Sequence, residues 1–115
     1  MRRIAQAASW ILLFSIVALS VVPVDLRPIT ILPHSVEHAA IFFLAGCFFG
    51  IANANHFIKT LLCLGAFSLV VEVIQIWVPG RHARVSDFLV DALSIAVGLV
   101  GGAALARALT RHRGQ

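Results

Sequence analysis

Seven polar residues stand out in this hydrophobic chain because acid–base chemistry and the binding of charged ligands use side chains of these types. They are His38, Glu72, Gln75, Arg81, Arg84, Asp87 and Asp91. Carboxylates and imidazole exchange protons, guanidinium groups bind anions, and an amide both donates and accepts hydrogen bonds. Six of the seven fall between residues 72 and 91. We interpret them as candidate members of one polar site.

The composition indicates that these residues lie in a membrane. The chain has 115 residues, of which 60% are hydrophobic and 12% charged, and its mean hydropathy is +0.97. A charged side chain at the centre of a membrane helix opposes insertion by about 2.5–3.5 kcal/mol. We therefore expect Glu72 and Asp91 to face the interior of a helical bundle and to have partners there.

The elements that must position the site are four apolar segments, each near the ~20 residues that cross ~30 Å of hydrocarbon. The sequence predicts an all-α, polytopic membrane protein, a single domain over residues 1–115 with four transmembrane helices in an antiparallel bundle. The predicted helices span roughly residues 4–22, 36–54, 57–78 and 85–106. A cleavable signal peptide is the alternative interpretation of the first segment.

The basic residues predict the orientation of these helices. Six of them (Arg2, Arg3, Lys59, Arg107, Arg111 and Arg113) fall on the side of the two termini, and three (Arg27, Arg81 and Arg84) on the other. This excess predicts a protein integral to the cytoplasmic membrane with both termini cytoplasmic. The second helix then begins, the third ends and the fourth begins at the outer side, which brings all seven candidate residues toward one layer.

The net charge of +4 does not indicate a nucleic-acid partner, because no basic helix face with interleaved aromatic residues is present. There is also no HExxH motif and no short metal-ligand spacing, so we predict no metal and no cofactor. Cys47 and Cys63 lie in apolar segments without CxxC spacing and are predicted to pack as small apolar residues. Neither Ser68 nor Ser94 occupies a GxSxG-like turn, so no catalytic residue is assigned.

Two GxxxG steps predict close helix contacts. Gly46 and Gly50 form one step in the second helix, and Gly98 and Gly102 form the other in the fourth. Such steps let helix backbones approach closely. The contact is either within the bundle or between copies in a homo-oligomer.

The ordered set of polar motifs resembles the VanZ-like family of small membrane proteins. The motifs are VEH at residues 36–38, E-x-x-Q at Glu72 and Gln75, PGR at 79–81 and VSD at 85–87, within a resemblance spanning residues 33–102. Two positions depart from the family pattern, with Ser35 where a lysine is common and Asp91 where an asparagine is common. The resemblance implies a relative of a protein associated with low-level teicoplanin resistance.

The leading functional hypothesis is an outward-facing pocket that binds or processes a lipid-linked or glycan-bearing envelope component, with membrane lipid as the surrounding partner. Arg81 and Arg84 would hold an anionic group, while His38, Glu72 and the two aspartates orient it or exchange protons. The alternatives are an intramembrane acid/base or metal-assisted hydrolase or transferase, a non-catalytic assembly subunit, and a salt-bridged plug that only fixes helix register. The sequence does not decide whether the protein is an enzyme.

Topology reporters test the predicted orientation. A fusion after Gln115 is expected to report the cytoplasmic side, and an insertion within residues 25–30 the outer side, because the basic excess lies with the termini. The opposite pair of results would place the candidate site on the cytoplasmic face.

Overall fold

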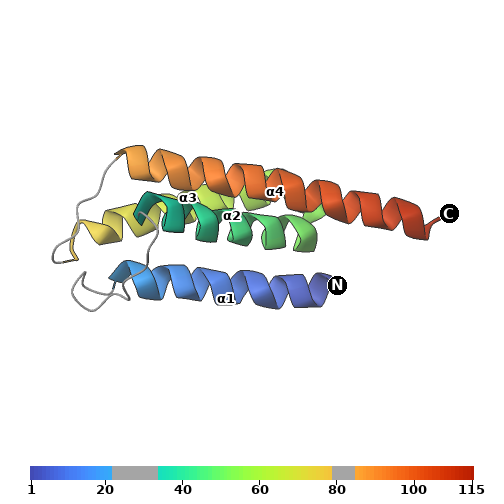
Figure 1. The fold of residues 1–115 in the computed structure, drawn as a ribbon, viewed down its shortest axis with the longest axis horizontal. Helices are drawn as coiled ribbons and strands as arrows, with labels where there is room; N and C mark the ends of the chain where they lie inside the picture. The colour runs from blue at the N-terminus through green and yellow to red at the C-terminus, as the bar shows by residue number, and fades with distance from the viewer. Residues whose placement is uncertain (22–33, 79–84) are drawn as a thin grey trace.

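The fold is a bundle of four long helices, seen in a computed structural model that describes residues 1–21, 34–78 and 85–115 (Figure 1). The elements are α1 (Arg2–Val21), α2 (His34–Ala52), a short 3₁₀ turn η2 (Ala54–His56), α3 (Phe57–Gln75) and α4 (Val85–Arg113). The described residues contain no strand. The predicted all-α fold is confirmed.

The helices run alternately up and down, so the two ends of the bundle differ in charge (Figure 1). At one end α1 and α3 finish and α2 and α4 begin. We call it the acidic end because it carries Glu37, Glu72, Asp87 and Asp91. The opposite, basic end holds both chain termini, and its charged residues are Arg2, Arg3, Lys59, Arg107, Arg111 and Arg113.

Two helix boundaries differ by three residues or more from those predicted from hydropathy. α3 ends at Gln75 rather than near Val78, and the next three backbone N–H groups donate to carbonyls three residues back, as in a tightened final turn. The following proline, Pro79, disfavours helical geometry at Val78. α4 continues to Arg113 rather than ending near Ala106, so the basic tail is helical.

Exposed and buried positions follow the arrangement of a membrane protein. The large exposed side chains are mostly apolar and lie on every helix, among them Ile4, Phe14, Leu44, Ile58, Leu62 and Val97. The buried polar residues are Ser9, Ser20, Ser68, Glu72, Gln75 and Asp91. An apolar exterior around a partly polar interior suits lipid as the surrounding solvent.

Three helical segments meet the length and apolarity of a membrane span: Arg2–Val21, Ala54–Gln75 and Val85–Arg113. The apolar part of α2, Val36–Ala52, is shorter. Seventeen residues nevertheless rise about 26 Å, close to the thickness of the hydrocarbon core. Length and composition thus support a bundle that crosses a membrane, as predicted.

The central contact is between α2 and α4, which run parallel and approach backbone to backbone. A Cβ atom added to Gly46 or Gly50 would collide with the carbonyl oxygens of Ile95 and Leu99, respectively. In the opposite direction, Gly98 and Gly102 face the backbone of α2 at Phe43 and Cys47. Both predicted GxxxG steps therefore lie in one interface within the chain.

This placement bears on the predicted homo-oligomer. While Gly46, Gly50, Gly98 and Gly102 are buried between α2 and α4, the same surfaces cannot pack against a second copy. A homo-oligomer formed through these steps would first require the two helices to separate. An oligomer that leaves this interface intact must use other surfaces.

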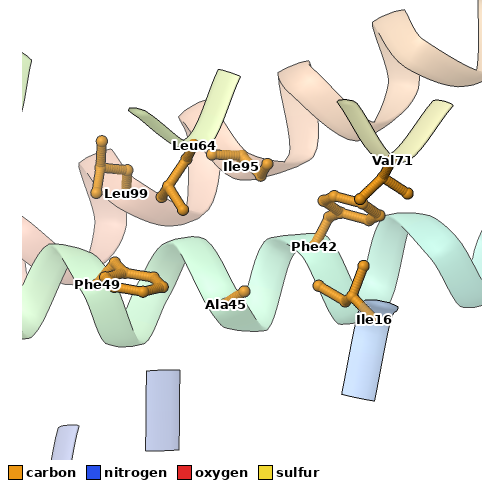
Figure 2. Close-up of a cluster of buried hydrophobic side chains, with 8 residues drawn as sticks. All are labelled: Ile16, Phe42, Ala45, Phe49, Leu64, Val71, Ile95 and Leu99. Carbon is orange, nitrogen blue, oxygen red and sulfur yellow. The ribbon is translucent and has the colours of Figure 1, made fainter. Parts of the chain in front are cut away.

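All four helices contribute to the apolar core (Figure 2). α2 supplies Phe42, Ala45 and Phe49, while Ile16 comes from α1, Leu64 and Val71 from α3, and Ile95 and Leu99 from α4. In Figure 2, Phe42, Val71 and Ile16 gather at one end of the cluster. The core therefore joins α1 and α3 to the α2–α4 pair.

Two arginines bind the carbonyls where α2 ends and the chain turns back. Arg2 Nε, from α1, donates to the Ala52 carbonyl oxygen at 3.0 Å, and Arg107 Nη2, from α4, donates to that of Ala54 at 3.0 Å. The last carbonyls of a helix have no partner within it, and cations are favourable there. Both arginines thus bind the α2–α3 turn, one from α1 and the other from α4.

The adjacent residues Gly101 and Gly102 provide a matched test of the α2–α4 contact. Gly102→Ala is expected to destabilise the protein by about 1–3 kcal/mol, because the added methyl group meets backbone atoms of Cys47. Gly101→Ala is the control, since a Cβ there meets nothing within 4 Å. Thermal unfolding in detergent measures both, and equal midpoints for the two variants would contradict the interface.

Candidate functional site

α4 places one aspartate inside the bundle and the other near its edge. Asp91 is 1% exposed, whereas Asp87 is half-buried in the first turn of the helix. An acid in the first turn of a helix interacts favourably with the positive end of the helix dipole. Asp87 therefore has a simple structural role, while the burial of Asp91 requires another explanation.

α2 brings His38 to Asp91. The His38 Nδ1 atom lies 3.6 Å from Asp91 Oδ2, and the His38 side chain is 12% exposed. The glycine contact places Gly46 opposite Ile95, and the same register one turn earlier sets Phe42 level with Asp91. His38 is one further turn toward the acidic end. The two residues form an ion pair when the imidazole is protonated.

α3 contributes two polar residues in its last turn. Glu72 is 6% exposed and Gln75 is 4% exposed, and they continue the buried face that begins with Leu64 and Ser68. These positions recur at steps of three and four residues, so they form one stripe along the helix. His38, Glu72, Gln75 and Asp91 together are called the polar layer below.

Some buried polar atoms of the layer have no hydrogen-bond partner among the described residues. Both carboxylate oxygens of Asp91 and the amide nitrogen of Gln75 are in this state. Leaving such a group unsatisfied costs about 1–3 kcal/mol, and more for a charged one. A layer built only to hold helices together is expected to avoid this cost, so an additional hydrogen-bonding group fits these atoms.

The aromatic ring of Phe42 separates the polar layer from the apolar core. Phe42 is fully buried, with its ring centre 6.0 Å from that of His38 and 6.5 Å from that of Phe67. It belongs to the group with Val71 and Ile16 seen in Figure 2. Because Glu72 follows Val71 directly, the change from apolar to polar occurs at about the same depth on both helices.

Two residues near the polar layer were not among the sequence-based candidates. Glu37 directly precedes His38 and is half-buried, with one carboxylate oxygen enclosed. Ser68 is fully buried one turn before Glu72, and its hydroxyl donates to the Gly65 carbonyl at 2.9 Å. The four-residue step from Ser68 to Glu72 was the sequence signal that could have identified Ser68 as part of the same helix face.

Trp77 is 83% exposed, consistent with a membrane-interface anchor.

Arg81 and Arg84 lie outside the described residues, so their predicted role in holding an anion stays a prediction. Within the described part of the chain, no three His, Cys, Asp or Glu side chains gather as metal ligands would. Cys47 and Cys63 are free thiols on α2 and α3.

Comparison with known proteins places the chain in a family. The family model described as VanZ/LLP1 matches residues 1–106, which include all of α1 as well as the motifs of the polar layer. The chain belongs to the VanZ/LLP1 family. No curated protein and no solved structure matches it.

Membership in the VanZ/LLP1 family confirms the resemblance read from the VEH, E-x-x-Q, PGR and VSD motifs. Together with the apolar helices, it establishes a VanZ-like membrane protein. Asp91, one of the two positions where this chain departs from the family pattern, is the residue paired with His38.

Exchanging each aspartate of α4 tests whether the polar layer carries an energetic cost. Asp91→Asn is expected to stabilise this VanZ/LLP1 protein by about 1–3 kcal/mol, because it replaces a buried carboxylate, whose oxygens accept no hydrogen bond from a described residue, with a neutral amide of similar size. Asp87→Asn is the control, expected to destabilise by about 0.3–1 kcal/mol through loss of its favourable contact with the helix end. Thermal midpoints in detergent measure both, and a large loss for Asp91→Asn would show that the carboxylate is fully satisfied.

Proposed function

We propose that the polar layer forms the inner part of a site that binds a polar component of the cell envelope, lipid-linked or glycan-bearing. The observation that supports it most directly is Asp91, which is buried to 1% exposure while neither carboxylate oxygen accepts a hydrogen bond from a described residue. Such an acid is suited to a ligand that brings its own donors, such as hydroxyl, amide or ammonium groups.

The neighbours of Asp91 would each have a different role in recognising the ligand. His38, on the adjoining helix, fixes one side of the carboxylate and can exchange a proton with it. Gln75 offers an amide donor for a ligand oxygen, and Glu72 adds a second acid on the same helix face. The site would therefore favour a ligand with several hydroxyl or amide groups.

Arg81 and Arg84 complete the proposal as the predicted anion-binding residues. They connect α3 to α4 in the sequence and follow the last turn that carries Glu72 and Gln75. A phosphate or diphosphate linking a glycan to its lipid is the type of anion that paired guanidinium groups bind. We propose further that the protein resides in the cytoplasmic membrane with both termini inside, so that this site faces the envelope.

One observation favours an enzymatic alternative. The separation of 3.6 Å between His38 Nδ1 and Asp91 Oδ2 places a carboxylate where it can orient an imidazole and stabilise its charged form. Such a pair could act as general acid or base on a lipid-linked phosphate. Release of phosphate from such lipids by purified protein, lost in His38→Ala, would establish catalysis, whereas binding without turnover would leave a binding protein.

Family membership suggests the cellular assay, namely low-level resistance to teicoplanin. Expression in a susceptible bacterium is expected to raise the inhibitory concentration. His38→Ala and Glu72→Gln are expected to abolish the increase, because they remove groups from the polar layer while the apolar core is unchanged.

Ser94→Ala is the matched control on α4, because the Ser94 hydroxyl donates to the Val90 carbonyl at 2.7 Å and is not part of the layer. Membrane levels of all variants are compared by immunoblot. If both layer variants are present at normal levels and still raise the inhibitory concentration as the wild type does, the polar layer is not the functional site.

A further inference from the structure

A small cavity lies at the basic end, away from the polar layer. Its volume is about 140 Å³, and it is lined by Met1 and by residues of α1, α2, η2 and α4, which are Arg2, Ile51, Ala54, Asn55, Ala106, Arg107 and Thr110. A single water occupies roughly 30 Å³ of liquid, so the cavity admits a group of several heavy atoms. Its charged side chains, Arg2 and Arg107, are both cationic.

These arginines have hydrogen-bonding capacity left over. A guanidinium has five N–H donors, and each arginine donates one hydrogen bond to a backbone carbonyl, Arg2 through Nε and Arg107 through Nη2. No acidic residue of the chain is near them in sequence, since residues 1–24, 38–71 and 92–115 contain no Asp or Glu. Within the described residues neither arginine forms a salt bridge. The cavity is therefore electrostatically suited to an external anion.

A second hollow extends from Arg2 along α1. It measures about 570 Å³ and is lined by Arg2, Arg3, Gln6, Ala7 and Trp10. The indole of Trp10 is half-exposed and packs edge-to-face on Phe49, with ring centres 5.9 Å apart. The arginines at one end of this hollow are therefore followed by an apolar surface at Ala7 and Trp10, in the direction that leads into the membrane. A phospholipid has the same sequence of groups, from its phosphate to its acyl chains.

We propose that Arg2 and Arg107 form a binding site for the phosphate of an anionic membrane phospholipid, with the lipid tails lying along α1 past Trp10. α1 and α4 do not pack against each other in the described part of the chain, and each reaches the α2–α3 turn through its own arginine. A phosphate held by both arginines links these two helices. The lipid thereby stabilises the end of the bundle where the glycine contact has already ended.

The test uses the purified full-length protein in a zwitterionic detergent. Phosphatidylglycerol is expected to raise the thermal midpoint, whereas phosphatidylcholine with identical acyl chains leaves it unchanged. Arg107→Gln is expected to weaken the apparent affinity for phosphatidylglycerol roughly tenfold, and Arg2→Gln/Arg107→Gln by more, because charge-assisted hydrogen bonds to phosphate are lost. Both arginines also bind backbone carbonyls, so replacing them lowers the thermal midpoint even without lipid. The comparison therefore uses the lipid-dependent shift of each variant rather than its absolute midpoint.

The matched control is Arg111→Gln/Arg113→Gln, which removes two positive charges from the same end but none from the cavity lining. An equal loss of affinity in this control would overturn the proposal in favour of diffuse attraction to anionic lipid. Sodium phosphate and glycerol phosphate form the second arm, and stabilisation by either as large as that by the lipid would overturn the lipid assignment. Arg107→Lys keeps the charge without the planar fork and is expected to retain part of the shift, so the site stays testable if a glutamine variant fails to fold.

Discussion

The close approach of the α2 and α4 backbones is the constraint on which the rest of this structure depends. Gly46, Gly50, Gly98 and Gly102 remove the side chains that would keep the helices apart, and each meets backbone atoms of the other helix. In lipid there is no hydrophobic force between apolar helices, so packing of this kind is a main source of association. The same contact fixes the register that sets His38 beside Asp91.

The two ends of the bundle handle charge in opposite ways. At the basic end, Arg2 and Arg107 bind backbone carbonyls from exposed positions, so their remaining donors stay accessible to solvent. At the acidic end, Glu72 and Asp91 are buried, with only 6% and 1% of each residue exposed. The first arrangement stabilises the fold at little expense. The second opposes it, which is characteristic of residues kept for function.

Much of this architecture was predictable, because hydropathy is the strongest signal in a membrane sequence. It located four helices, and four short motifs indicated the family. It misplaced the end of α4 because the apolar run stops near Ala106, whereas alanine, leucine and arginine continue to favour a helix as far as Arg113. The predicted end of α3 near Val78 is the residue before Pro79, but residues 76–78 form a tightened turn, which hydropathy does not distinguish from a continued α-helix.

The specific contacts were not predictable for a different reason. A GxxxG step predicts a close contact without naming the partner helix, and α2 and α4 are separated by the whole of α3. The pairing of His38 with Asp91 depends on that choice and on the register within it. The hydrogen bonds of Arg2 and Arg107 could not be predicted from the sequence either, because their acceptors are main-chain carbonyls, which every residue has.

The pairing of α2 with α4 also determines the order in which the protein can assemble. After Gly46 and Gly50 leave the ribosome, about fifty more residues must be made before their partners Ile95 and Leu99 leave it, a delay of roughly 3–10 s at ordinary rates of synthesis. During that interval α1 is the neighbour already available to α2, and the glycine surface is open to other helices in the membrane. Biogenesis of this small protein therefore includes a period in which an incomplete bundle must be kept from pairing with the wrong partner.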